Sequence, residues 1–122
     1  MARILIVDDS PSQLLGMKRI VEKLDHEIVT AEDGASGVEV AKSTMPDLIL
    51  MDVVMPNLNG FQATRAISKE PSTANIPVVL VTTKDQETDK VWGMRQGAKA
   101  YITKPFTEAQ LIEVINSLLV AG

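Results

Sequence analysis

Charged side chains follow three short apolar runs of this 122-residue chain. Asp52 ends the run 47–52, the pair Asp8 and Asp9 follows the first run, and Lys104 follows the last. An acidic group at the end of a buried strand is costly unless a charged or reactive group lies opposite it. A carboxylate nucleophile, an acidic pair and a lysine are the groups that a metal-assisted phosphoryl acceptor needs.

These side chains are positioned by strands and helices that alternate along the chain. Apolar runs predict strands over residues 3–7, 27–31, 47–51, 77–81 and 100–103. Helical spacing of apolar residues predicts helices from Pro11, over 34–43, 60–69 and 86–96, and from about Thr107. Five strand–helix units in a row indicate an α/β fold with a parallel sheet covered on both faces.

Two helix starts have recognisable capping residues. Ser10 is a suitable N-cap, and Pro11 suits the first helical position. Thr107 and Gln110 have the spacing of a capping box at the start of the last helix. On the fourth helix we expect Trp92, the single tryptophan, to pack against the neighbouring helix.

Length and composition favour one domain spanning residues 1–122, with no output domain after the fifth helix. Hydrophobic residues make up 45% of the chain, which suffices for a packed core. The chain lacks an apolar run long enough to insert into a membrane, and it lacks cysteine, so we expect a cytoplasmic protein. The net charge of −4 argues against nucleic acid as a partner.

The carboxyl ends of parallel strands form one edge of a sheet, where ligands of open α/β folds bind. Asp8, Asp9, Asp52, Thr82 and Lys104 are all placed at such ends, although periodicity alone does not make their strands adjacent. Two carboxylates about 4 Å apart repel by roughly 4 kcal/mol at a typical effective dielectric, so a cluster needs positive charge. Oxygen ligands without histidine or cysteine favour Mg²⁺ over Zn²⁺.

The chain resembles the receiver domains of two-component response regulators over its whole length. The matching features are Asp8-Asp9, Asp52 followed by Met55-Pro56 and Gly60, Thr82, Gly97-Ala98, and Tyr101 with Lys104-Pro105-Phe106. The resemblance implies a flavodoxin-like, doubly wound fold with five helices and five parallel strands in the order 2-1-3-4-5.

The resemblance also implies how the acidic residues act. Asp52 would accept the phosphoryl group from the phosphohistidine of a sensor histidine kinase. Asp9, Asp52 and the backbone carbonyl of Val54 would bind Mg²⁺, with Asp8 supporting the metal directly or through water. Lys104 would pair with the phosphoryl oxygens, and the Lys104–Pro105 bond would be cis.

A conformational switch is the output that the resemblance implies. Thr82 would hydrogen-bond the phosphoryl group, and Tyr101 would be the aromatic rotamer switch. The face formed by the fourth helix, fifth strand and fifth helix would then bind a downstream effector. The single-domain form is similar to chemotaxis regulators, and residues 89–97 are similar to receivers of the type IV pilus twitching-motility system.

Three other functions fit parts of this pattern. A phosphatase with an aspartyl nucleophile usually has a second acid two residues on, where this chain has Val54. A flavin-binding protein is disfavoured because Asp8 and Asp9 would repel a phosphate dianion. A receiver-like docking module that is never phosphorylated stays open. We expect no enzymatic activity beyond self-phosphorylation and autodephosphorylation.

Overall fold

The computed structural model describes residues 1–120, in which five strands and five helices alternate. The strands are β1 (Arg3–Val7), β2 (Glu27–Ala31), β3 (Leu48–Met51), β4 (Val78–Thr82) and β5 (Ala100–Thr103). The helices are α1 (Pro11–Glu22), α2 (Gly34–Thr44), α3 (Gly60–Lys69), α4 (Glu87–Arg95) and α5 (Glu108–Val120). The predicted series of five β–α units is confirmed.

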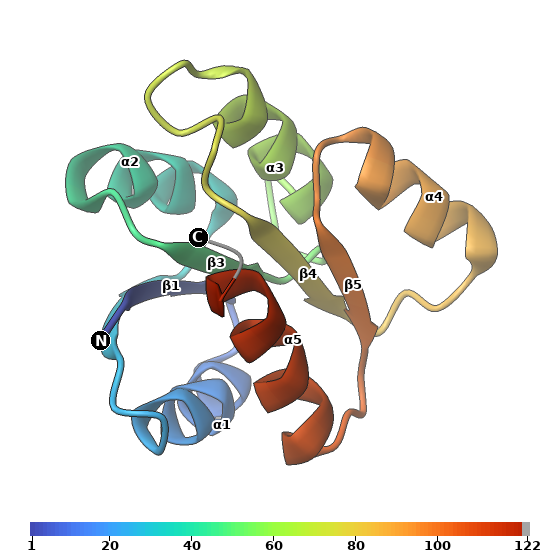
Figure 1. The fold of residues 1–122 in the computed structure, drawn as a ribbon. Helices are drawn as coiled ribbons and strands as arrows, with labels where there is room; N and C mark the ends of the chain where they lie inside the picture. Colours follow the sequence, from blue (N-terminus) through green and yellow to red (C-terminus); the bar gives the residue numbers. More distant parts are fainter. Residues whose placement is uncertain (121–122) are drawn as a thin grey trace.

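All strand pairs are parallel, and the sheet has the order β2-β1-β3-β4-β5 (Figure 1). Every residue of β3 and β4 is buried, as is β1 from Ile4 onward. Because a parallel strand between two helical layers is shielded on both faces, it needs apolar side chains on both, which explains the unbroken apolar runs. The order confirms the flavodoxin-like fold.

Helices cover both faces of the sheet, with α1 and α5 on one side and α2, α3 and α4 on the other (Figure 1). Alternate residues of each strand point to opposite faces. On the α1 and α5 side the buried side chains include Ile4, Ile6, Met17, Val21, Leu111 and Ile115. On the other side they include Leu5, Val7, Val38, Ala41, Ala63 and Ile67. The two clusters fix the sheet between its helices.

Some boundaries differ from the predicted ones by a single residue. β4 begins and ends one residue later than the predicted 77–81, and its last residue, Thr82, pairs with Thr103 in the parallel ladder. α4 is shorter than the predicted 86–96 because Gln86 and Gln96 are its capping residues and not part of the helix. Thr82 is therefore part of the ladder and is held by the sheet itself.

The predicted helix starts are confirmed for α5 and in part for α1. The Thr107 amide donates to Gln110 Oε1 over 2.8 Å, and the Gln110 amide donates to Thr107 Oγ1 over 3.1 Å. Pro11 begins α1, and Ser10 holds the N-cap position, but the Ser10 side chain makes no capping hydrogen bond.

The helix α4 rests on the sheet through Gly93, its buried residue. Trp92 is 51% exposed, so the predicted packing of this side chain against the neighbouring helix is wrong. Val91 and Met94 are exposed as well. The outer side of α4 therefore presents apolar side chains to solvent.

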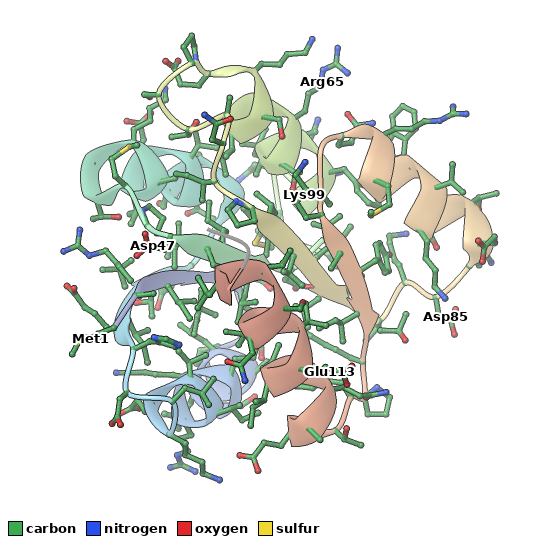
Figure 2. The ribbon with its side chains drawn as sticks, in the orientation of Figure 1. Met1, Asp47, Arg65, Asp85, Lys99 and Glu113 are labelled. Atoms are coloured by element: carbon green, nitrogen blue, oxygen red, sulfur yellow. The ribbon has the colours of Figure 1, made fainter. Side chains whose placement is uncertain are left out.

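Most charged side chains lie on the outside of the molecule, as Arg65, Asp85 and Glu113 illustrate (Figure 2), whereas Asp8 and Asp52 are buried. Across residues 1–120, we find no helix with both the length and the apolar character needed to cross a membrane.

Two buried threonines give a matched test of the packing around α3. Thr73 Oγ1 donates to the Ile67 carbonyl over 2.7 Å, whereas Thr64 Oγ1 has no hydrogen-bond partner among the described residues. Thr64→Val should leave the free energy of unfolding unchanged or raise it by up to about 1 kcal/mol, because valine removes an unsatisfied hydroxyl. Thr73→Val should lower it by about 1–2 kcal/mol. Urea denaturation of both variants measures the difference, and equal losses would contradict it.

Candidate phosphoacceptor site

The end of β1 supplies two carboxylates in different environments. Asp8 is buried, its Oδ1 accepts a hydrogen bond from the Ser10 amide at 2.9 Å, and its Oδ2 lies 3.0 Å from Lys104 Nζ. Asp9, the next residue, is exposed. Asp8 is therefore held in place by its neighbours, whereas Asp9 faces the solvent side of the site.

The end of β3 supplies the third carboxylate. The register pairs Val7 with Met51, and the Asp52 amide continues this ladder by donating to the Val7 carbonyl at 2.9 Å. The Asp52 side chain is buried, and its Oδ1 accepts a hydrogen bond from the Val53 amide at 2.9 Å. A Cβ at Gly60 would collide with the Asp52 main chain, so glycine is needed for α3 to begin so close to the site.

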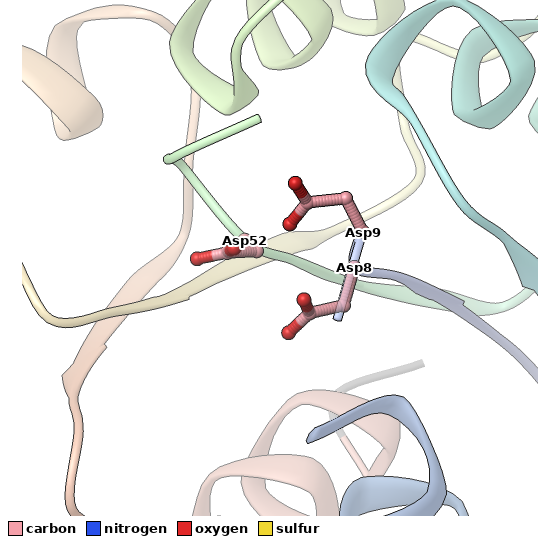
Figure 3. A group of neighbouring side chains, drawn as sticks. All are labelled: Asp8, Asp9 and Asp52. Carbon is pink, nitrogen blue, oxygen red and sulfur yellow. The ribbon is translucent and has the colours of Figure 1, made fainter. Parts of the chain in front are cut away.

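The three carboxylates meet at the carboxyl edge of the sheet and point to the same side (Figure 3). One oxygen from each of Asp8, Asp9 and Asp52 lies within 4.8 Å of the other two. Lys104, which follows β5, places its Nζ 3.7 Å from Asp52 Oδ1. The predicted convergence of these four side chains is confirmed. The Lys104–Pro105 bond is cis, as predicted.

Burial raises the pKa of Asp52 above the ordinary value for aspartate. The Lys104 ammonium acts against this because it favours the carboxylate, while Asp8 and Asp9 raise the pKa further by repulsion. The net direction is upward, so the one lysine does not compensate for the desolvation and the two neighbouring charges. The cluster still lacks positive charge.

The donor set fits a divalent cation that prefers oxygen. Both Asp8 oxygens are engaged, by Ser10 and by Lys104. Among the described residues, no hydrogen bond involves the Asp9 carboxylate or Asp52 Oδ2. Mg²⁺ is typically bound through one or two carboxylates and keeps several waters. Asp9 and Asp52 therefore have oxygens available for such an ion, and Asp8 is suited to a supporting role.

Beyond the carboxylates, Thr82 and Tyr101 are joined through the main chain of Lys84. Thr82 is fully buried at the end of β4, and its Oγ1 accepts a hydrogen bond from the Lys84 amide at 3.3 Å. The Tyr101 hydroxyl donates to the Lys84 carbonyl at 2.7 Å. Burial and then Asp89 raise the pKa of Tyr101 to about 12, so the hydroxyl stays protonated and can donate.

Sequence reasoning missed the groups that connect and support the site. The amides of Ser10, Val53 and Lys84 are main-chain groups, which every residue except proline carries. No sequence signal marks them. Val54, predicted to offer its backbone carbonyl to the metal, lies in the loop after β3 with its side chain 54% exposed. Its carbonyl as a metal ligand stays a prediction.

The raised pKa of Asp52 predicts that Asp52→Asn increases the stability of the folded protein, by an amount that depends on pH. The folded state holds the Asp52 proton more tightly than the unfolded state, so ionisation lowers stability as the pH rises from the ordinary aspartate pKa through the folded-state pKa. Without metal, Asp52→Asn should therefore unfold at a higher temperature than the parent at pH 7. The gain should vanish below the ordinary aspartate pKa.

Calorimetry over a pH series measures this difference, and added Mg²⁺ provides the control. A ligand at one hundred times its Kd stabilises the folded state by about 2.7 kcal/mol, so Mg²⁺ should raise the Tm of the parent more than that of Asp52→Asn. A variant that is less stable than the parent at pH 7 without metal would contradict the electrostatic account.

Residues 4–116 match the response regulator receiver domain. The chain is 56% identical to protein PilH of Pseudomonas aeruginosa over 119 residues, covering 98% of each protein. It is also 37% identical to the response regulator PleD of Caulobacter vibrioides, covering 96% of this chain but 26% of PleD.

Solved structures agree with this match. The chemotaxis protein CheY4 of Vibrio cholerae superposes with a TM-score of 0.91 at 29% identity, over 98% of this chain and 99% of CheY4. The receiver domain of a P. aeruginosa sensor histidine kinase, solved with a magnesium ion in its active-site cleft, has a TM-score of 0.90 at 27% identity, over 97% of each chain. Receiver domains take a phosphoryl group from sensor histidine kinases and act on downstream effectors. The chain belongs to the response regulator receiver domain family.

Proposed function

We propose that Asp52 is the phosphoacceptor of this receiver and that a histidine kinase is its donor. The observation that carries this proposal is the meeting of Asp8, Asp9 and Asp52 within 4.8 Å, beside Lys104. An Asp52 carboxylate oxygen attacks the phosphorus of the phosphohistidine. The N–P bond breaks, its electron pair stays on the imidazole nitrogen, and an acyl phosphate forms on Asp52.

Asp9, Asp52 and the Val54 carbonyl would hold Mg²⁺, and Asp8 would support it. The ion would neutralise charge on the transferring phosphoryl oxygens. Lys104 is already fixed between Asp8 and Asp52 at 3.0 and 3.7 Å, so its ammonium would pair with a phosphoryl oxygen without a large movement. Preorganised charge of this kind lowers the barrier because little has to rearrange during the reaction.

The phosphoryl group would then act as a switch on Thr82 and Tyr101. A phosphoryl group adds about two negative charges and strong acceptors. If the Thr82 side chain rotated so that its hydroxyl moved toward the phosphoryl group, Oγ1 would leave the Lys84 amide and that hydrogen bond would be lost. The loop carrying Lys84 also holds the Tyr101 hydroxyl, so the change would reach the face formed by α4, β5 and α5. We propose that this face binds the effector, with exposed Trp92 at the contact.

The pathway that we propose is control of type IV pilus twitching motility by chemotaxis-like signalling. Two observations support this choice: the similarity of residues 89–97 to receivers of that system, and the 56% identity to PilH. We propose that the protein acts as a single receiver domain, because the match to this chain covers 98% of PilH. We propose a cytoplasmic location and no nucleic-acid partner, in keeping with the net charge of −4.

Intact mass spectrometry tests the phosphoacceptor directly. After incubation with acetyl phosphate and Mg²⁺, the parent should gain one phosphoryl group, and it should gain none in excess chelator. Asp52→Asn should gain none, because it lacks the nucleophile. Lys104→Met should be phosphorylated at least tenfold more slowly than the parent. A phosphorylated Asp52→Asn would place the acceptor elsewhere. No adduct on the parent under any condition would favour the unphosphorylated docking module.

Gly93 allows a test of the switch. A Cβ at Gly93 would lie 2.6 Å from Leu80 Cδ1 and 3.2 Å from the Tyr101 ring, so Gly93→Ala should displace the ring or α4 and cost about 1–3 kcal/mol of stability. The emission of Trp92, on the same helix, should change in the parent on adding Mg²⁺ and beryllofluoride, a phosphoryl mimic. Gly93→Ala should lose most of that change.

Gly37→Ala is the matched control, because Gly37 is also a helical glycine tight against the sheet, 3.0 Å from Val7 Cγ2, but lies on α2. It should lose stability yet keep the Trp92 response. Equal responses in the two variants would show that the contact of Gly93 with Tyr101 does not couple the site to α4.

A further inference from the structure

Four basic side chains lie on the flank of the molecule where α3 and α4 are neighbours (Figure 1). They are Arg65, Lys69, Arg95 and Lys99, and all four are exposed. Across residues 1–120, none of the four forms an ion pair with a carboxylate. Although the whole chain has a net charge of −4, this α3–α4 flank therefore presents positive charge to the solvent.

Two contacts hold the C-terminal ends of α3 and α4 together. Arg65 Nη1 donates to Gln96 Oε1 over 3.5 Å, and Gln96, the C-cap of α4, is only 6% exposed. A Cβ on Gly97 would collide with Ser68 Oγ, so the turn after α4 rests directly on α3. Arg65 and Lys99 lie on this flank (Figure 2). The basic side chains are thus carried by a fixed junction between the two helices.

The helix dipoles account for only two of the four charges. Lys69 lies in the last turn of α3 and Arg95 in the last turn of α4, where positive charge stabilises a helix. Arg65 lies earlier in α3, and Lys99 lies beyond the end of α4. Neither a helix dipole nor an ion pair within residues 1–120 therefore accounts for Arg65 and Lys99.

Trp92 lies beside this positive charge. It precedes Gln96 by four residues, so the two side chains project from the same side of α4, the side that contacts Arg65. Trp92 and Arg95 line a groove of ≈ 310 Å³ along α4, together with Glu87, Thr88 and Val91. Trp92 is 51% exposed. Tryptophan and arginine are enriched among the residues that contribute most to binding at protein interfaces.

The distribution of charge along this groove indicates an acidic protein segment as its occupant. Arg95 lies at the C-terminal end of the groove, beside Arg65, whereas Glu87 lies at its N-terminal end. A protein segment can place carboxylates at the basic end alone and an apolar side chain on Trp92. A nucleic acid would bring regularly spaced phosphates along the whole groove, and those near Glu87 would be repelled.

We propose that the α3–α4 flank is an interaction surface for an acidic segment of the effector protein. Carboxylates of this segment pair with Arg65 and Arg95, and an adjacent apolar side chain packs on Trp92. This inference rests on the proposed function, which places Trp92 at the effector contact. It extends that contact from α4 onto α3 and names the chemistry of the partner.

A random peptide library displayed on phage is the probe for this surface. The library is selected on the parent with Mg²⁺ and beryllofluoride at physiological salt, and the retained peptides should be enriched in aspartate and glutamate. The most enriched peptide is then synthesised, together with a copy in which an amide replaces each acidic side chain. Fluorescence anisotropy of the labelled peptides measures their affinity.

The acidic peptide should bind the parent at least tenfold more tightly than its amide copy does. It should also bind the parent at least tenfold more tightly than it binds the double variant Arg65→Glu/Arg95→Glu. The matched control is Lys18→Glu/Arg19→Glu, which reverses two exposed charges on α1 and has the same net charge. This control should bind the peptide as the parent does. Labelling of both double variants by acetyl phosphate within twofold of the parent would show that they are folded.

Three outcomes would overturn the proposal. The first is a set of retained peptides without an excess of acidic residues. The second is an equal loss of binding in the two double variants, because net charge alone would then explain it. The third is binding of phosphatidylglycerol vesicles or duplex DNA that is tighter than that of the acidic peptide and is lost in Arg65→Glu/Arg95→Glu. That result would assign the flank to a membrane or a nucleic acid.

The proposed function fails in a different way. Mg²⁺ and beryllofluoride should tighten the binding of the acidic peptide. Binding that requires Arg65 and Arg95 but is equally tight without beryllofluoride would support the acidic contact and show that the proposed switch does not control it. A parent that gains no phosphoryl group from acetyl phosphate would contradict the phosphoacceptor assignment, whatever the peptide binding.

Discussion

Repulsion among three carboxylates at one edge of the sheet is the constraint on which the rest of the site depends. Parallel pairing of β1 with β3 sets Asp8 and Asp9 beside Asp52, and the ladder itself keeps them there. Cores packed on both faces of the sheet hold the ladder in place. The acids therefore cannot separate to relieve their repulsion. Burial raises the pKa of Asp52, and Asp8 and Asp9 raise it further against the effect of Lys104.

The lack of positive charge in this cluster gives the site its chemistry. Lys104 contacts two of the acids at once and so cannot neutralise all three. A divalent cation is the simplest remedy, and once bound it makes the same pocket attractive to a phosphoryl group that the bare acids would repel. Repulsion among the carboxylates therefore favours the binding of a divalent cation at this site.

The fold and the charged residues of the site were predictable, while their connections were not. Strand-length apolar runs located the five β–α units, and the acids and Lys104 stood out because they end such runs. The order of the strands came from the family resemblance, because periodicity does not report which strands are neighbours. The link from Thr82 to Tyr101 uses the Lys84 main chain, and Trp92 stays exposed because Gly93 takes the contact with the sheet. Such details depend on tertiary packing, which residue types alone do not specify.

The two faces of the sheet carry separate apolar clusters, and each cluster includes an aromatic residue near the site. Phe106, in the loop after β5, joins the apolar cluster on the face covered by α1 and α5. Tyr101 instead packs with the cluster under α2, α3 and α4, against Gly93. Asp52 lies between the two faces at the end of a central strand. Because Phe106 and Tyr101 belong to different apolar clusters, a substitution that repacks one face of the sheet can leave the other face undisturbed.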